Sequence, residues 1–245
     1  MKDAENITAL LFDFGGTLDS PSRHASRVLR DGLKHAGLYP EENIWREAYV
    51  YAERKLEAEA IIAPGDDYFV TLYKKICIEI ERMKTQSDSF SDIITPQSAR
   101  AAAGYCFDNA LAYVKQILPS LQQLKRWYKL GLVTNFYGNI STVLGSLGLD
   151  NLFSSVTESA QVGVRKPDPD IFRIALDKTG CKAEDTIVIG DSLHNDILPS
   201  MSLGCHAVWL KGEGWTDKVE SAPADCEDAD SLVSFMRLLM GKYNK

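Results

Sequence analysis

The chain has 245 residues, of which 45% are apolar and 25% are charged, so it can form one large domain or a core domain carrying an insert. These ordinary globular values exclude an intrinsically disordered, collagen-like or coiled-coil protein. The formal net charge is −7 and the basic residues are scattered along the chain, so we expect no nucleic acid partner.

The cysteines and the N-terminal segment indicate a compartment. The five cysteines are an odd number at wide spacings and form no Cys-x-x-Cys pair, which is typical of reduced thiols in a cytoplasmic protein. The apolar run after residue 6 is too short for a signal peptide or a membrane span. We therefore expect a cytoplasmic protein with no membrane partner, and no pattern indicates an oligomeric state.

Short apolar runs alternate with segments of helical periodicity along most of the chain. The first run, at residues 7–12, ends at Asp13, and a final amphipathic helix is predicted at about residues 230–240 after a long loop. The other runs lie at residues 131–134, 154–156, 186–189 and 205–210. This alternation predicts an α/β fold, a Rossmann-like doubly wound parallel sheet with helices on both faces.

One long stretch, about residues 22–117, interrupts this alternation. It has no convincing strand but four segments with apolar residues at helical spacing, which predicts an inserted α-helical cap domain. The aromatic residues Trp45, Tyr49 and Tyr51 follow the same spacing, so we expect them in the core of the insert rather than in a functional site.

The predicted domains follow from the ends of the insert. Residues 1–20 and 118–245 are expected to form the core domain, and residues 21–117 the cap domain. Linkers near Asp19–Pro21 and Ile117–Ser120 would then let the cap move relative to the core.

Polar side chains gather where the predicted strands end. Ligands of open parallel sheets bind at the carboxyl ends of the strands, so residues at these ends are candidates for a site. Each one alone has an ordinary explanation as a helix cap, a loop residue or a surface charge, but together they predict a shared site. They are Asp13, Thr134, Asn135, Lys166, Asp191, Ser192 and Asp196.

Four short motifs in this set resemble those of the haloacid dehalogenase superfamily. They are FDFGGTL at residues 12–18, LVTN at 132–135, Lys166–Pro167, and GDSLHND at 190–196. The resemblance covers residues 7–19 and 119–210, and the insert is similar in position and type to the small α-helical (C1-type) cap of the family. It implies a hydrolase with catalytic residues Asp13, Thr134, Lys166 and Asp191.

The chemistry of these residues suits a phosphorylated small metabolite as substrate. Asp13 would attack phosphorus and form an aspartyl-phosphate, which splits one difficult displacement into two steps. The hard oxygen ligands that Mg²⁺ prefers are offered by Asp13 and Asp191 and, as the resemblance implies, by the backbone carbonyl of Gly15.

Other residues are expected to hold the phosphoryl group. Candidates with a backbone N–H, a hydroxyl or an ammonium group are Gly15, Gly16, Thr134, Asn135 and Lys166. Behind the direct ligands we expect Asp196 and Ser192, where Asp196 would orient metal-bound water or Lys166.

The motif departs from the family pattern at Gly15. Phosphatases of the family usually carry there a second aspartate, the general acid and base, whose contribution is worth about 10² to 10⁴ in rate. Three interpretations therefore stay open. The chain is a Mg²⁺-dependent phosphatase with weak activity, a degenerate member that binds metal and ligand without turnover, or a metal-independent 2-haloacid dehalogenase.

Overall fold

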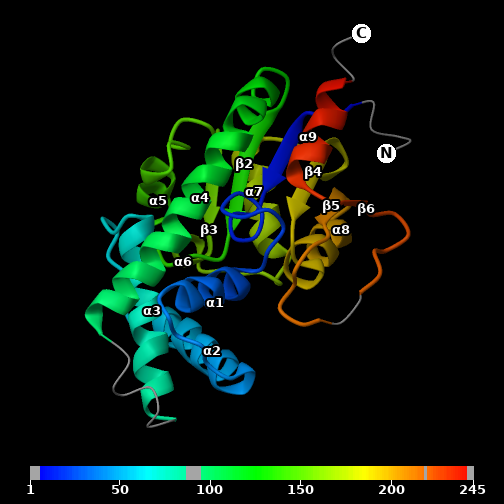
Figure 1. The fold of residues 1–245 in the computed structure, drawn as a ribbon. Helices are drawn as coiled ribbons and strands as arrows, with labels where there is room; N and C mark the ends of the chain where they lie inside the picture. The colour runs from blue at the N-terminus through cyan, green and yellow to red at the C-terminus, as the bar shows by residue number, and fades with distance from the viewer. Residues whose placement is uncertain (1–5, 87–94, 218–219, 242–245) are drawn as a thin grey trace.

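The computed structural model describes residues 6–86, 95–217 and 220–241, which contain one six-stranded sheet (Figure 1). The strands are β1 (Ala9–Phe12), β2 (Lys129–Thr134), β3 (Ser155–Glu158), β4 (Thr186–Gly190), β5 (His206–Leu210) and β6 (Glu227–Ala229). Their order is β3-β2-β1-β4-β5-β6, and every neighbouring pair is parallel. The predicted Rossmann-like sheet is confirmed, and β6 lies where we predicted a loop.

The central strand β1 is buried on both faces of the sheet, as a parallel sheet covered by helices requires. Leu10 and Phe12 belong to the larger hydrophobic core, whereas Leu11 packs in a second core with Phe172 on the opposite face. Burying each such side chain contributes about 1.5 to 3 kcal/mol. The core-side helices are α5 (Ile140–Ser146), α6 (Ser159–Val162), α7 (Asp170–Thr179), α8 (Leu198–Ser202) and α9 (Leu232–Gly241), with a short 3₁₀ helix η2 (Ala183–Asp185) and a short π-helix η3 (Leu193–Ile197).

The predicted insert is helical. Its helices are α1 (Ala25–His35), α2 (Glu42–Ala58), α3 (Tyr68–Lys84) and α4 (Pro96–Leu124). Side-chain hydrogen bonds cap the N-termini of α3 and α4. The Asp67 carboxylate accepts the Val70 N–H at 2.8 Å, and Thr95 forms a capping box with Ser98. In Figure 1, α1, α2 and α3 lie together beyond one end of the sheet, and α4 runs from them along the sheet.

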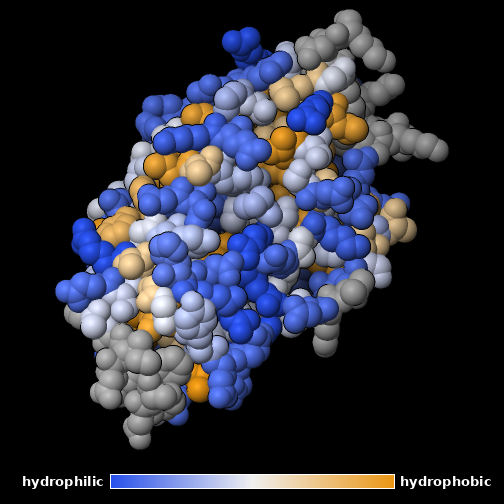
Figure 2. Space-filling model, in the orientation of Figure 1, coloured by the Kyte–Doolittle hydropathy of each residue, from blue (hydrophilic) through white to orange (hydrophobic). Residues whose placement is uncertain are grey.

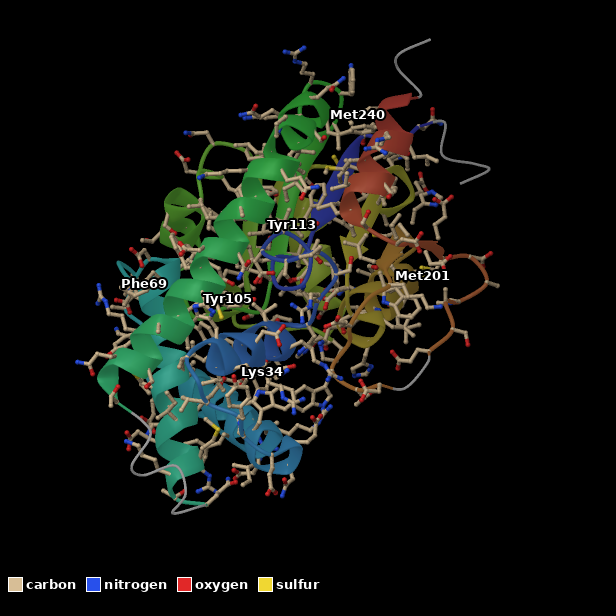
Figure 3. All side chains as sticks on the ribbon, in the orientation of Figure 1. Lys34, Phe69, Tyr105, Tyr113, Met201 and Met240 are labelled. Atoms are coloured by element: carbon tan, nitrogen blue, oxygen red, sulfur yellow. The ribbon has the colours of Figure 1, made fainter. Side chains whose placement is uncertain are left out.

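Helix α4 passes through the linker that we predicted at Ile117–Ser120, so that prediction is wrong. The helix continues to Leu124 with Pro119 inside it. Tyr105 stacks on His35 of α1, with ring centroids 4.5 Å apart, and Tyr113 is buried two turns further along α4 (Figure 3). One continuous helix therefore packs against α1 and α3 of the insert and against α9 on the core side.

The first predicted linker, Asp19–Pro21, is a loop, and the residues after it are fixed to the core. The Ser22 carbonyl accepts the Glu213 N–H at 2.9 Å, and the His24 N–H donates to the Glu213 carbonyl at 2.9 Å. Gly212 lets the two segments approach, because a Cβ at that position would lie 1.9 Å from the Ser22 carbonyl oxygen. The insert is thus tied to the core at both ends.

The division of the chain into domains remains a proposal, and its second boundary falls inside α4. Of the predicted cap, residues 87–94 lie outside the described part of the chain. Of the predicted core, residues 1–5, 218–219 and 242–245 do.

Hydrophilic side chains prevail on the face shown in Figure 2, where apolar residues form separate patches. Trp45 is fully buried in the insert as predicted, but Tyr51 is 38% exposed and lies under the Arg82 guanidinium, so its predicted place in the core is wrong.

All five cysteines are free thiols. Within the described residues, no helix combines the length and apolarity needed to cross a membrane.

Glu79 is a buried carboxyl group on α3. It is fully shielded from solvent, and neither carboxyl oxygen has a hydrogen-bond partner in the described part of the chain. Burial raises its pKa to about 8, although the attraction of Lys75 one turn earlier opposes the shift. The folded protein therefore holds a proton on Glu79 at neutral pH, whereas the unfolded chain, with an ordinary pKa of 4.5, releases it.

We expect Glu79→Gln to stabilise the protein at neutral pH, because glutamine needs no proton to stay neutral. Between pH 4.5 and 8 the folded wild type binds more protons than the unfolded chain, so its stability falls as the pH rises through that window. The variant should gain about 3 kcal/mol of unfolding free energy at pH 7 and less than about 1 kcal/mol at pH 5. Urea unfolding at both pH values measures the gain.

The matched control is Glu81→Gln, on the same helix, whose exposed carboxylate pairs with Lys84. It should change the unfolding free energy by less than about 0.5 kcal/mol at either pH. A gain from Glu79→Gln that is equal at the two pH values would contradict a protonated Glu79.

Candidate active site

The carboxyl ends of the central strands open into one cavity of about 660 Å³. Asp13 follows β1, Thr134 ends β2 and Asp191 follows β4, and all three line the cavity. The strand order changes direction at β1 and β4, which is where ligands of such sheets bind. The other predicted site residues that line it are Gly15, Asn135, Lys166, Ser192 and Asp196, whereas Gly16 does not.

Three carboxylates meet at this end of the sheet. Asp13, Asp191 and Asp196 each offer an oxygen, and these oxygens lie within 4.8 Å of one another. Burial raises the pKa of Asp13 to about 7, although Lys166 opposes the shift. Burial, and then repulsion from Asp13 and Asp196, raises the pKa of Asp191 well above its usual range.

Lys166 connects two of these carboxylates. Its ammonium group donates to Asp13 Oδ1 and to Asp196 Oδ1, both at 2.6 Å, and only 3% of its side chain is exposed. Burial alone would lower the pKa of Lys166, but the two carboxylates outweigh it and raise the pKa, so the group stays charged. The Asn135 side chain fixes the backbone of Lys166 on both sides, since it accepts the Lys166 N–H at 2.9 Å and donates to the Lys166 carbonyl at 3.0 Å.

The loop after β1 is shaped by two glycines with different surroundings. Gly16 has a φ of +78°, and a Cβ there would lie 2.3 Å from Asp191 Oδ2, so only glycine lets this loop approach Asp191. Gly15 does not adopt the left-handed conformation, and a Cβ there would have no heavy atom within 4 Å. The Gly16 N–H donates to Asp19 Oδ1 at 2.7 Å, which holds the loop in place.

The loop after β4 positions the remaining carboxylates. Asp196 Oδ2 accepts the Ser192 N–H at 3.1 Å, and a Cβ at Gly190 would lie 2.5 Å from the Asp196 carboxyl carbon. The Asp191 carbonyl accepts the Trp209 indole N–H at 2.9 Å. Asp196 is held where it accepts a hydrogen bond from Lys166, and orienting Lys166 is one of the two roles expected for it.

Our sequence prediction did not include the residues of the insert that line the cavity. Among them are Glu53 and Tyr49 of α2 and Lys75 and Tyr68 of α3, together with His24. Tyr49 is buried as predicted, but it also faces the cavity.

A signal for Lys75 is present in the sequence. The buried face of α3 contains Leu72, Ile76 and Ile80, and Lys75 and Glu79 occupy positions of the same face. A charged side chain at a position expected to be buried is a candidate for a functional or paired group.

The site offers the oxygen ligands that a hard divalent cation prefers. The carboxylates of Asp13 and Asp191 converge with one ammonium group nearby, which leaves a net negative charge in a buried place. The close approach that Gly16 allows brings the backbone of the same loop beside the Asp191 carboxylate. A cation there, with the Lys166 ammonium, would allow an anionic group to enter this acidic cavity.

We expect Asp191→Ala to weaken divalent cation binding strongly, because it removes one of two converging carboxylates. The raised pKa of Asp13 and Asp191 means that protons compete with the cation, so affinity should fall as the pH falls through about 7, by up to about tenfold per pH unit for each displaced proton. Calorimetric titration at pH 6 and pH 8 measures both effects. The control is Asp177→Ala, which removes an exposed carboxylate on α7, and equal binding by wild type and Asp191→Ala would refute the site.

Gly16→Ala should also impair the cation site, because its Cβ would displace the Asp191 carboxylate. Gly148→Ala is a matched control, since Gly148 has nearly the same φ, +76°, but a Cβ there would have no heavy atom within 4 Å. Both variants share the backbone strain of a left-handed residue, about 1 to 2 kcal/mol, but only Gly16→Ala should lower cation affinity, by about tenfold or more. The same loss in both variants would show that the contact with Asp191 is not the cause.

Comparison with known proteins identifies relatives of this chain. It is 28% identical over 219 residues to a glyceraldehyde 3-phosphate phosphatase from Methanopyrus kandleri, covering 86% of this chain and 87% of the relative. It is 36% identical over 87 residues to a phosphoserine phosphatase from Thermus thermophilus, covering 35% of each chain.

The fold has relatives among solved structures. A crystal structure of a dehalogenase with an intermediate complex matches with a TM-score of 0.63 at 16% identity, covering 95% of this chain and 97% of that one. At this identity the likeness supports the fold alone. The family model described as haloacid dehalogenase-like hydrolase matches residues 7–199, which include all four motifs. The chain therefore belongs to the haloacid dehalogenase-like hydrolases.

Proposed function

We propose that the chain is a Mg²⁺-dependent phosphatase that acts on a phosphorylated small molecule through an aspartyl-phosphate on Asp13. One observation carries the proposal. The nucleophile candidate Asp13, the charged Lys166 and the acidic residues Asp191 and Asp196 lie together in one cavity at the carboxyl ends of the strands. The phosphatase names of the two relatives reported above support the same reaction class.

Each residue of the core has a defined task in this reaction. The Asp13 carboxylate attacks phosphorus while the P–O bond to the leaving oxygen breaks on the opposite side, and water then cleaves the acylphosphate, which releases orthophosphate and restores Asp13. Lys166 holds Asp13 in place and balances the charge of the phosphoryl oxygens, and the Thr134 hydroxyl and the Asn135 N–H donate to these oxygens. Asp13, Asp191 and the carbonyl of Gly15 would hold Mg²⁺, whose charge offsets that of the phosphoryl group.

The residue missing from this mechanism is a proton donor for the leaving oxygen. At Gly15 the side-chain space is open, and the nearby Asp19 carboxylate is occupied, since it accepts the Gly16 N–H and the Tyr68 hydroxyl, the latter at 2.6 Å. The leaving group must therefore carry its own negative charge in the transition state. We infer that activity is weak on alkyl phosphates and stronger on phosphates with acidic leaving groups.

The open space at Gly15 also favours the second candidate, a degenerate protein that binds metal and ligand without turnover. A metal-independent 2-haloacid dehalogenase ranks below both. Halide departure needs neither a cation nor a proton donor, so that reaction would leave the cluster of Asp13, Asp191 and Asp196 without a task.

Gly15→Asp should restore a donor beside the leaving oxygen. Because the position has free space and an ordinary backbone conformation, the variant should raise kcat on an alkyl phosphate by up to about 10² to 10⁴. The gain should be smaller on p-nitrophenyl phosphate or acetyl phosphate, whose leaving groups need little protonation. Steady-state kinetics with and without Mg²⁺ measure these rates.

The matched control is Gly15→Asn, which has nearly the same shape but no acidic proton to transfer, and it should show no gain. If the wild type hydrolyses alkyl and aryl phosphates equally well and Gly15→Asp lowers both rates, another residue already supplies the proton. If wild type and variant bind Mg²⁺ but leave every phosphate ester intact, the degenerate candidate replaces the enzyme.

A further inference from the structure

An ion pair lies in the wall of the cavity that the insert contributes. Glu53 of α2 and Lys75 of α3 contact each other through Glu53 Oε1 and the Lys75 ammonium, and both line the cavity that Asp13 also lines. Only 8% of the Lys75 side chain and 34% of the Glu53 side chain are exposed. We call these two residues the cap pair.

Aromatic residues hold the cap pair in position. The Tyr137 hydroxyl, from the loop after β2, donates to Glu53 Oε2 at 2.8 Å, and the Lys75 ammonium lies 4.5 Å from the centre of the Tyr49 ring. The pair is thus tied to a loop of the core as well as to two helices of the insert. A side chain fixed from several sides is suited to recognising one shape of ligand.

The charges of the cap pair cancel each other. Burial alone would raise the pKa of Glu53, but Lys75 and the Tyr137 hydroxyl lower it, so Glu53 is an anion. Burial alone would lower the pKa of Lys75, but Glu53 raises it well above the usual range, so Lys75 is a cation. Burial, with Lys75, lowers the pKa of the neighbouring His24 to about 4, so its imidazole is neutral at pH 7.

The cap pair still has hydrogen-bonding capacity for a ligand. Within the described residues, the Lys75 ammonium donates to Glu53 and also to the Tyr137 hydroxyl oxygen, which leaves one N–H group. The Glu53 carboxylate accepts from Lys75, Tyr137 and Tyr49, and a carboxylate has about four lone-pair sites, so one is left for a ligand. A hydroxyl group, which donates and accepts, can bind both residues without separating the pair.

A second anionic group would fit this wall poorly. A carboxylate bound to Lys75 would lie beside the Glu53 carboxylate, in a cavity that already contains Asp13, Asp191 and Asp196. Like charges in a buried site repel strongly, and Lys75 is already neutralised by Glu53. The wall therefore favours neutral polar groups over charged ones.

We propose that the cap pair Glu53–Lys75 is the leaving-group subsite, and that it selects phosphate esters of neutral polyhydroxy compounds over phosphate esters of carboxylic acids. This inference rests on the proposed phosphatase function. It predicts that a ligand with a hydroxymethyl group binds more tightly than one with a carboxylate at the same place.

Two probe ligands isolate that difference, since glycerol 3-phosphate carries a hydroxymethyl group where 3-phosphoglycerate carries a carboxylate. Calorimetric titration of the Asp13→Asn protein with Mg²⁺ measures binding of each ligand without turnover. We expect glycerol 3-phosphate to bind at least about tenfold more tightly. Equal affinity, tighter binding of 3-phosphoglycerate, or binding of neither ligand would overturn the proposal.

Variants of the cap pair test in which direction the ratio of the two affinities changes. Glu53→Gln, in the same Asp13→Asn background, leaves Lys75 uncompensated and should shift the affinity ratio toward 3-phosphoglycerate by about tenfold or more. The double variant Glu53→Gln with Lys75→Met removes both charges, so it avoids a buried unpaired cation and keeps the test valid if the single variant fails to fold. It should weaken glycerol 3-phosphate binding, and an unchanged ratio and affinity would overturn the proposal.

The control for these variants is Glu47→Gln, on the same helix, whose carboxylate pairs with Arg82 and does not line the cavity. It should leave the ratio unchanged. Turnover by wild type on the phosphate panel is read separately. If the binding preference holds but no ester is hydrolysed, the subsite stands and the phosphatase function fails. If esters are hydrolysed without a binding preference, the phosphatase function stands and the subsite fails.

Discussion

The contact of the Lys166 ammonium with Asp13 and Asp196 is the interaction on which the site depends. It joins residues that follow three different parts of the sheet, of which Lys166 and Asp196 are 3% exposed and Asp13 is 12% exposed. Burying such charges is costly unless each is paired, so the loops that carry them must be placed accurately. The Asn135 side chain fixes the Lys166 backbone, and the missing side chain at Gly190 leaves room for Asp196.

Much of this core site could be predicted from the sequence. Asp13 and Asp191 lie just after apolar runs and Thr134 ends one, and the carboxyl ends of parallel strands lie at one edge of a sheet. Strand β6 could not be predicted in this way. It is a three-residue edge strand, Glu227–Ala229, with the polar sequence EDA, and it is a strand because it pairs with β5 rather than because of its own residues.

The side of the site formed by the insert could not be predicted to the same depth. Glu53 and Lys75 lie 22 residues apart on two helices, and their contact depends on how α2 packs against α3 and how both face the strand ends. Helical spacing indicates which residues are buried, but not which cavity they line. It therefore predicted the burial of Tyr49 but not its place in the cavity.

The continuity of α4 has a consequence for how such proteins can be recombined. The helix packs against α1 and α3 of the insert and against α9 on the core side, so residues 96–124 cannot be divided between two parents without cutting a hydrogen-bonded helix. A transplant of the insert onto a related core would have to carry all of α4 and receive it in a matching groove beside the sheet. Exchange of substrate preference within this architecture is therefore easier by point replacement on α2 and α3 than by moving the insert as a block.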